Sequence, residues 1–414
     1  VPSVHLTELG GPGQMTRVSF RGRSSRHTLF KVDGIPVRDA LDSTDASILF
    51  GNSLQLKKVT PGSGGIWEGS GSTGGTINFI TPFAHAHKHT TTVAGGSHNT
   101  GYLHSMHGQT KNDTAVVVHG EGFNTAGLPQ KGPQRLYGER AHVQKGALAG
   151  AFNHQYHSGH LQMNVRQITT HSKYDTNDPT DPFSPKPQGT NTQNLTLIGG
   201  QVTRQTLKTH HRLQAFVTQN KRKSTGALSS TLHTYGTYYD LEHALTQKTS
   251  INTFAGIDFD DLTKGDFKKE NISKSHLGLL GQYHLTPQFL IFAGARLNHH
   301  QKFGQITTYS GGAAWSNTQQ GITASMHTGF LNPSLYDLHV NDAYAQSNPN
   351  LRPEESQTLE MTFWQKIGHQ GTIKIKPYWS RIKKMIQFQQ LNTGRFQNQN
   401  IQGTSRVSGL ETSL

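Results

Sequence analysis

The chain has 414 residues, of which 45 are glycine, 25 are histidine and none is cysteine; hydrophobic residues make up 32% of it and the formal net charge is +14. No run of about 18 consecutive apolar residues occurs, which excludes a transmembrane helix. The lack of cysteine excludes a disulfide scaffold, a thiolate zinc site and a cysteine nucleophile. A polar, glycine-rich chain of this length with aromatic residues throughout leaves open a β-barrel with a polar interior, in which only alternate residues need be apolar.

Residues 1–82 form short β-like runs separated by glycines. The runs are Val18–Arg21, Leu29–Val32 and Ile77–Ile80. Asp33-Gly34 stands between Leu29–Val32 and the next apolar residues, and this dipeptide favours a two-residue hairpin because glycine adopts positive φ without steric cost. We therefore expect a small mixed α/β domain with few helices.

From about residue 83 onward, apolar and polar residues alternate in segments of about 9–13 residues, as in Ile251–Phe259. Period two predicts β-strands with one apolar face. Short turns such as 111–113, 157–159 and 286–288 alternate with long polar loops such as 177–191 and 337–353. That alternation is typical of an outer-membrane barrel. We expect about 16 strands between residues 88 and 414; a soluble sandwich or propeller is the alternative.

Two sequence patterns that form nucleotide or metal sites in other proteins lack the features those sites need in this chain. Gly69–Gly74 matches the nucleotide-binding pattern G-x-G-x-x-G, but a β-like run follows it where that site needs a helix. His85, His87 and His89 alternate along one segment without a nearby acidic residue, so we expect no metal site. The basic residues form no dense run, which disfavours nucleic-acid binding. We predict no catalytic residue and no cofactor.

Five segments together resemble the TonB-dependent outer-membrane receptors. In the first domain these are Val18–Gly22, Thr28–Val37 and Glu68–Thr81, which are similar to the motifs of that family's plug domain. In the second they are Asn348–Ser356 and Ser408–Glu411, which are similar to late barrel motifs. The chain departs from the pattern around Thr60-Pro61-Gly62, where the family carries Arg-Gly-Pro.

The resemblance implies an all-β transmembrane fold, an antiparallel barrel of 22 strands in the family with a small plug domain in its lumen. We expect residues 1–82 to be the plug and residues 83–414 the barrel. About 16 strands are too few for that barrel, so we expect the chain to lack C-terminal strands and the first part of the plug. No TonB-binding segment (Ton box) is recognisable before residue 18.

The function implied by the resemblance is import of a scarce, bulky nutrient across the bacterial outer membrane, driven through TonB and its inner-membrane complex and without enzymatic chemistry. The implied partners are TonB, a small-molecule ligand and outer-membrane lipid. Plug residues placed near the ligand are Ser24, Ser25, Arg38, Asp39, Leu41, Asp42, Ser43, Thr44 and Trp67. Plug motif residues with a structural role are Arg21, Gly22, Asp33, Gly34, Gly69, Gly74, Gly75 and Asn78.

The spacing of the motifs is most similar to the cobalamin-receptor branch. Haem is the main alternative, because Phe330–Pro333 and Asn348–Leu351 bracket His339, which could ligate iron. Ferric siderophores remain open as well. A non-transporting barrel, a porin or an adhesin, is the alternative from another class.

Overall fold

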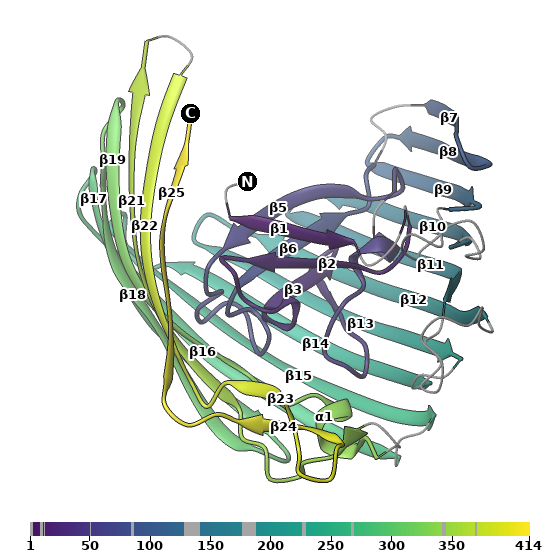
Figure 1. Ribbon diagram of the computed structural model, residues 1–414. Helices are drawn as coiled ribbons and strands as arrows, with labels where there is room; N and C mark the ends of the chain where they lie inside the picture. The colour runs from purple at the N-terminus through teal and green to yellow at the C-terminus, as the bar shows by residue number, and fades with distance from the viewer. Residues whose placement is uncertain are drawn as a thin grey trace.

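The computed structural model describes residues 3–8, 11, 13–49, 51–83, 87–127, 141–175, 188–225, 229–265, 269–341, 345–368 and 371–414. A large curved wall of antiparallel strands surrounds a smaller β domain on its concave side (Figure 1). The wall is one 16-stranded sheet with β7 and β25 at its two edges, so the barrel is not closed. This is the number of strands expected from the sequence.

The strands of the wall, in chain order, are β7 (Lys88–Gly96), β8 (Thr100–Lys111), β9 (Thr114–Thr125), β10 (Val143–Tyr156), β11 (Gly159–Asp175), β12 (Gln188–Gln205), β13 (Thr209–Ser224), β14 (Ser230–Ala244), β15 (Thr249–Gly265), β16 (Glu270–Thr286), β17 (Phe289–His300), β18 (Gly304–Ser316), β19 (Gln320–Leu331), β21 (Glu354–Ile367), β22 (Gly371–Lys383) and β25 (Thr404–Ser413). Each pairs antiparallel with its neighbours in the wall.

The connections at the two ends of the wall differ in length. Only two residues join β8 to β9, β10 to β11 and β16 to β17, and we call this the short-turn end. The opposite, long-loop end carries segments 126–142, 176–187 and 332–353. The predicted loop 177–191 ends earlier than expected because β12 already begins at Gln188, and the part before that lies outside the described residues.

The long-loop end also carries local structure of its own. Segment 332–353 contains the short helix α1 (Leu335–His339) and strand β20 (Ala345–Gln346). The connection from β22 to β25 forms a hairpin of β23 (Ile386–Gln390) and β24 (Phe396–Asn400), and β24 pairs with β20. The helix α1 and the strands β23 and β24 lie in the lower part of the molecule in Figure 1.

The alternating apolar residues face away from the enclosed domain. Val165, Phe259 and Leu279 are about half exposed, at 49%, 48% and 51%, whereas Arg166 and Gln193 are buried on the inner face. This pattern is typical of a β-barrel wall with lipid outside and polar groups inside. Because only the outward-facing residues of each strand need to be apolar, a low content of hydrophobic residues is sufficient for this fold. No helix among the described residues is long and apolar enough to cross a membrane, a result that concerns helices alone.

The enclosed domain consists of two small sheets. One pairs β1 (Val4–Glu8) with β2 (Thr16–Phe20). The other has the order β4-β3-β6-β5, formed by β3 (Thr28–Val32), β4 (Ile35–Val37), β5 (Gln55–Pro61) and β6 (Gly75–Ile80), with β3 and β6 parallel. Its helical parts in the described residues are the 3-10 turns η1 (Ser25–His27) and η2 (Ala46–Leu49). The helical content of the expected mixed α/β domain is thus limited to these two short turns.

Asp33-Gly34 forms the predicted hairpin between β3 and β4. Both residues have positive φ, 52° and 82°, as a type I′ turn requires, and Val32 pairs with Ile35. The Asp33 carboxylate also accepts hydrogen bonds from the backbone and hydroxyl of Thr81, both at 2.8 Å. The turn is therefore anchored to the segment that leads into the wall.

The glycine-rich run Gly69–Gly75 leads into strand β6, and its glycines allow close packing. A Cβ atom on Gly75 would lie 2.5 Å from Cδ2 of Phe20, which is fully buried, and one on Gly74 would lie 2.9 Å from the carbonyl oxygen of His27. The run therefore serves packing, and a strand stands where a nucleotide site needs a helix.

A buried ion cluster fastens the enclosed domain to the wall. The Arg21 guanidinium contacts Glu411 at 2.8 Å and Glu360 at 2.5 Å, and it lies 3.9 Å above the centre of the Tyr378 ring. Glu360 also pairs with Lys376 at 2.8 Å. A Cβ atom on Gly62 would collide with the Glu360 carboxylate, so the segment that departs from Arg-Gly-Pro lies beside the same cluster.

Arg21→Ala should destabilise the enclosed domain by about 3–5 kcal/mol, because it leaves the buried Glu360 and Glu411 without their shared cation. Hydrogen exchange of the β2 amides measures this as a fall in the free energy of local opening. Lys384→Ala is the matched control, since it breaks the exposed pair with Glu355 at 2.5 Å. Equal effects of the two variants would contradict the assignment.

Gly75→Ala should cost about 1–3 kcal/mol, because its Cβ would collide with the Phe20 ring. Gly101→Ala in β8 is the control, since a Cβ there meets no atom within 4 Å. The measurement is the urea midpoint for loss of near-ultraviolet circular dichroism. A larger shift for Gly101→Ala would show that close packing on Phe20 is not what requires glycine.

Candidate functional site

Two loops of the enclosed domain reach the long-loop end, residues 24–27 and 38–45, and we call them the apical loops. Their position follows from contacts with α1: the Tyr336 amide donates to the Ala40 carbonyl at 3.1 Å, and Arg26 pairs with Asp337 at 2.6 Å. Ser24 caps η1 by accepting from the Arg26 amide at 3.4 Å. These loops contain eight of the nine residues predicted to lie near a ligand.

Asp39 shapes the second apical loop from inside. Its Oδ1 atom accepts the backbone N–H groups of Leu41 and Ser43 at 2.9 and 3.1 Å, and Arg222 lies 3.9 Å away. Burial raises the pKa of Asp39 to about 6, against the lowering effect of Arg222 and the two amides. Thr44 is buried too and donates to the Val37 carbonyl at 2.7 Å. Asp39 and Thr44 therefore hold the loop and are turned inward.

The other predicted residues of these loops are accessible to different degrees. Ser24 is exposed, while Ser25, Leu41, Asp42 and Ser43 are half-buried. Arg38 donates to the Ser70 carbonyl at 3.0 Å and lies 3.7 Å from Asp42, and it faces a cavity beside the loops. Hydroxyl groups next to an apolar Leu41 provide the mixture of polar and apolar contacts typical of small-molecule sites.

Asp337 joins three parts of the long-loop end. It completes a capping box with Ser334 at the start of α1, pairs with Arg26 of the apical loop, and accepts a hydrogen bond from Asn398 of β24 at 2.6 Å. Its side chain is 3% exposed. Sequence reasoning missed both Arg26 and Asp337; the Ser334-x-x-Asp337 spacing signals the cap, but not the pairing partners.

His339 lies at the end of α1, between the two motifs that suggested a haem ligand. Its Nε2 atom faces the carboxylate of Glu270 at the start of β16. The imidazole therefore already has an anionic partner in this structure.

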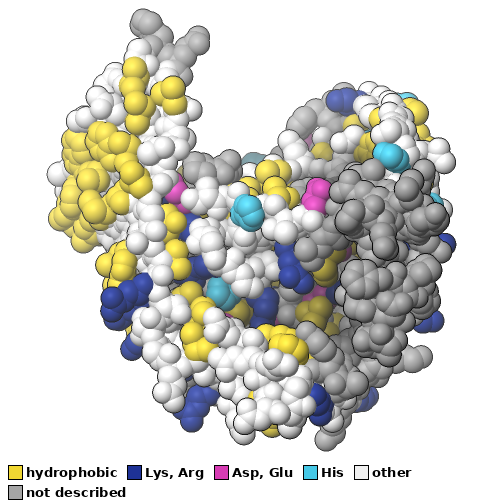
Figure 2. All heavy atoms as spheres, in the orientation of Figure 1, with side chains coloured by type: hydrophobic (Ala, Val, Ile, Leu, Met, Phe, Trp, Pro, Cys, Tyr) yellow, Lys and Arg dark blue, Asp and Glu magenta, His cyan; other side chains and the backbone are white. Residues whose placement is uncertain are grey.

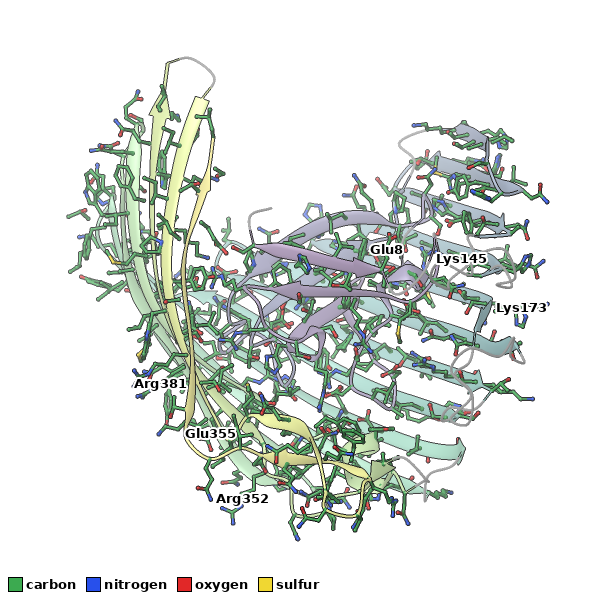
Figure 3. The ribbon with its side chains drawn as sticks, viewed as in Figure 1. Glu8, Lys145, Lys173, Arg352, Glu355 and Arg381 are labelled. Carbon is green, nitrogen blue, oxygen red and sulfur yellow. The ribbon has the colours of Figure 1, made fainter. Side chains whose placement is uncertain are left out.

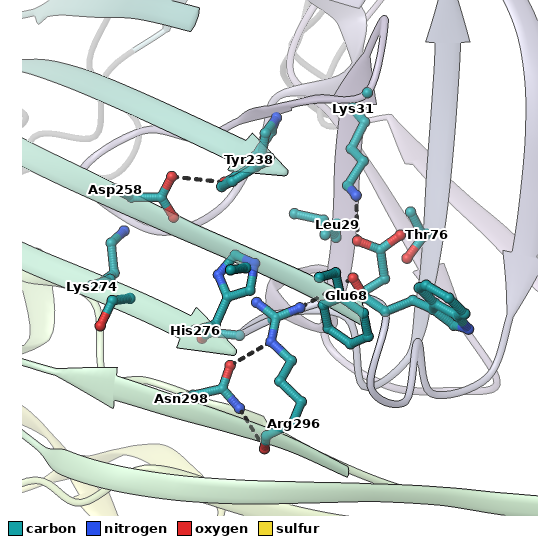
Figure 4. A pocket seen from close by; sticks show the side chains of 18 of the residues that line it. Leu29, Lys31, Glu68, Thr76, Tyr238, Asp258, Lys274, His276, Arg296 and Asn298 are labelled. Carbon is teal, nitrogen blue, oxygen red and sulfur yellow. Dashed lines mark hydrogen bonds and ion pairs between the residues drawn. The ribbon is translucent and has the colours of Figure 1, made fainter. Parts of the chain in front are cut away.

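A cavity of about 290 Å³ separates the enclosed domain from strands β13 to β18 (Figure 4). It extends from Asp240, near the short-turn end of β14, to His300 at the long-loop end of β17. Trp67 lines it and lies with its ring centre 5.1 Å from that of Phe254. Its predicted place in the apical loops is wrong, because the Ile66 and Trp67 carbonyls are held deeper in the wall by Arg296.

Several charged side chains of this cavity have a polar or charged partner. Tyr238 donates to Asp258 at 2.7 Å, Arg296 donates to Asn298 at 2.7 Å, and Lys31 contacts Glu68 (Figure 4). The lining nevertheless has six Lys or Arg and three Asp or Glu. Cations in excess make the cavity favourable for an anionic guest.

Some of the residues predicted to have a structural role also line this cavity. Gly34, Gly69 and Asn78 also line the cavity, and Asn78 accepts from the Gly34 amide at 3.2 Å. His85 lies outside the described residues. In the described part of the chain, no three His, Asp or Glu side chains lie close enough together to hold a metal ion.

Comparison with known proteins relates this architecture to one family. The family model described as "TonB dependent receptor-like, beta-barrel" matches residues 83–414. The vitamin B12 transporter BtuB of Vibrio cholerae serotype O1 is 26% identical over 452 aligned residues, and that of Vibrio vulnificus is 22% identical over 433. The alignments include 99% of this chain and 67% and 68% of those proteins, so the chain spans about two thirds of their length.

Among solved structures, the siderophore receptor PirA of Pseudomonas aeruginosa superposes with a TM-score of 0.74 at 17% identity, covering all of this chain and 81% of that one. At this identity the likeness concerns the fold. The family model covers most of the chain, and the residues that it matches include all strands of the wall. The chain belongs to the TonB-dependent receptor family of the bacterial outer membrane.

Proposed function

We propose that the protein imports cobalamin or another corrinoid, and that the ligand is recognised at the apical loops. The observation that carries the proposal is the similarity to two BtuB transporters across 99% of the chain, plug and barrel together. Hydroxyl groups of Ser24, Ser25 and Ser43 beside Leu41 suit a large ligand with amide edges and an apolar face.

In this proposal residues 1–82 act as the plug and residues 83–414 as the barrel, with TonB as the energising partner. The 290 Å³ cavity is at the lower limit of sites that enclose even a drug-sized molecule. A bulky nutrient therefore needs movement of the plug to pass between it and the wall. Binding and displacement are sufficient for this task, so we assign no catalytic residue.

A ferric siderophore or haem is the second candidate. The excess of cations in the cavity favours an anionic ligand, and the fold is shared with a structure named as a siderophore receptor. Haem ligation by His339 would require the imidazole to give up Glu270. A porin or an adhesin is less consistent with a lumen occupied by a packed domain.

Titration of the purified protein with cyanocobalamin, a ferric tris-catecholate and haemin should give saturable binding of cyanocobalamin at micromolar concentration or below. We expect haemin to give no Soret shift that His339→Ala removes, because Glu270 already engages that imidazole. Tryptophan quenching and difference absorption follow the three ligands in parallel. Binding of the catecholate alone would replace cobalamin by the second candidate.

Asp337→Asn should weaken ligand binding about tenfold, mainly through faster dissociation. The amide keeps the shape but lacks the charge that holds Arg26, so α1 is released from the apical loop. Stopped-flow fluorescence gives the dissociation rate. Glu355→Gln is the control, since its pair with Lys384 is on the exposed side of the wall. An equal increase in the dissociation rate for both variants would show that the contact between α1 and the apical loop does not retain the ligand.

A further inference from the structure

Lys and Arg side chains are visible on the concave side of the wall, around the enclosed domain (Figure 2). Six of them line the 290 Å³ cavity. Four of the six lie within 4.0 Å of a carboxylate, namely Lys31 with Glu68, Arg38 with Asp42, Arg212 with Asp240 and Lys274 with Asp260. Of the remaining two, Lys58 is exposed, whereas Arg296 is only 7% exposed.

The buried Arg296 differs from other buried cations between the enclosed domain and the wall. Lys145, which Figure 3 labels, has the Glu121 carboxylate 3.9 Å away. Within the described residues, no carboxylate oxygen lies within 4.0 Å of the Arg296 guanidinium. Arg296 is therefore the buried cation of this cavity that has no counter-anion in the described part of the protein.

Arg296 donates to neutral acceptors alone. Its Nε atom donates to the side-chain oxygen of Asn298 at 2.7 Å, and Nη1 donates to the carbonyl oxygens of Ile66 and Trp67 at 3.2 and 3.1 Å. Among the described residues, Nη2 has no acceptor. Because a buried charge without a counter-charge is costly, the space next to Nη2 favours an anion.

Gly69 keeps that space open. A Cβ atom on Gly69 would lie 3.2 Å from Nη2 of Arg296 and 3.9 Å from its Cζ. Gly69 does not have the positive φ that would itself favour glycine. The missing side chain therefore matters for the room that it leaves in front of the guanidinium nitrogen without an acceptor.

His276 provides a second polar group at the same place. It is the cross-strand partner of Asn298, so it lies diagonal to Arg296 on the inner face of the wall. Its ring lies 5.4 Å from that of Tyr238 and 6.4 Å from that of Phe254, centre to centre, and no described residue forms a hydrogen bond with it. Figure 4 shows the imidazole and the guanidinium side by side, facing the enclosed domain.

We propose that Arg296 and His276 bind a phosphate group, free or esterified, in this cavity. Nη2 carries two N–H groups and the imidazole can donate a third, and a phosphate has enough acceptor oxygens for all of them. The cavity is larger than a phosphate, so the substituent of an ester could lie against Trp67 and Phe254. Arg296, His276 and Gly69 lie outside the apical loops, so the inference does not depend on which nutrient is imported.

The test is isothermal titration calorimetry of the complete protein with inorganic phosphate and with phenyl phosphate. We expect saturable binding of both, with phenyl phosphate the tighter because its ring can contact the aromatic lining. Equal affinities would identify free phosphate as the ligand and would also support the site. Phenol, which has the ring but no phosphate, should not bind.

Two variants probe the site by different routes. R296Q removes the charge, and G69A fills the space in front of Nη2 while leaving the bonds to Ile66 and Trp67 available. Each should weaken phosphate binding at least about tenfold, because charge-assisted hydrogen bonds are lost. H276Q should weaken it less, since the guanidinium remains.

The matched controls are K145Q, which removes a buried cation that has its own carboxylate, and G101A, whose Cβ meets no atom within 4 Å. Both should bind phosphate as the native protein does. Near-ultraviolet circular dichroism checks that each variant is folded. The absence of saturable binding to the native protein, unchanged binding by folded G69A and R296Q, or an equal loss in the controls would overturn the proposal.

Discussion

Each strand of the wall must satisfy lipid on one side and a folded domain on the other. Because a lipid environment offers no hydrogen bonds, neighbouring strands of the wall pair through their backbones, and many of the outer side chains are apolar. The polar residues are then left for the inner face, where Arg166, Gln193 and Asn220 are buried. The enclosed domain can pack there only if its own surface supplies hydrogen-bond partners for these residues.

That requirement explains why the interface between the enclosed domain and the wall is rich in hydrogen bonds. Arg166 donates to the hydroxyl and carbonyl of Ser53 at 2.9 and 2.7 Å, and Gln214 donates to the Asp33 carbonyl at 2.9 Å. Hydrogen bonds of this kind are specific in direction yet modest in net free energy, unlike a large apolar interface. An apolar contact also exists, where Ile35 and Phe30 pack in one cluster with Ile168 and Leu197. Directional hydrogen bonds and this apolar cluster together fix the orientation of the enclosed domain.

Much of this architecture could be predicted from the sequence, since period-two alternation and turn length are local signals. They give the strands of the wall, and Asp33-Gly34 gives the hairpin. Pairings across hundreds of residues have no local signal: Arg26 meets Asp337, and Arg296 of β17 holds the Trp67 carbonyl. For this reason the apical loops were recognisable as loops, while the inward direction of Asp39 and the deeper position of Trp67 were not.

The two cations around Glu360 come from different parts of the molecule. Arg21 belongs to the enclosed domain, whereas Lys376 belongs to β22 of the wall. If the enclosed domain acts as the proposed plug and moves away from this position, Glu360 keeps the lysine that neutralises it, and only Glu411 loses its cation. The electrostatic cost of that movement is therefore lower than it would be if the enclosed domain provided both cations.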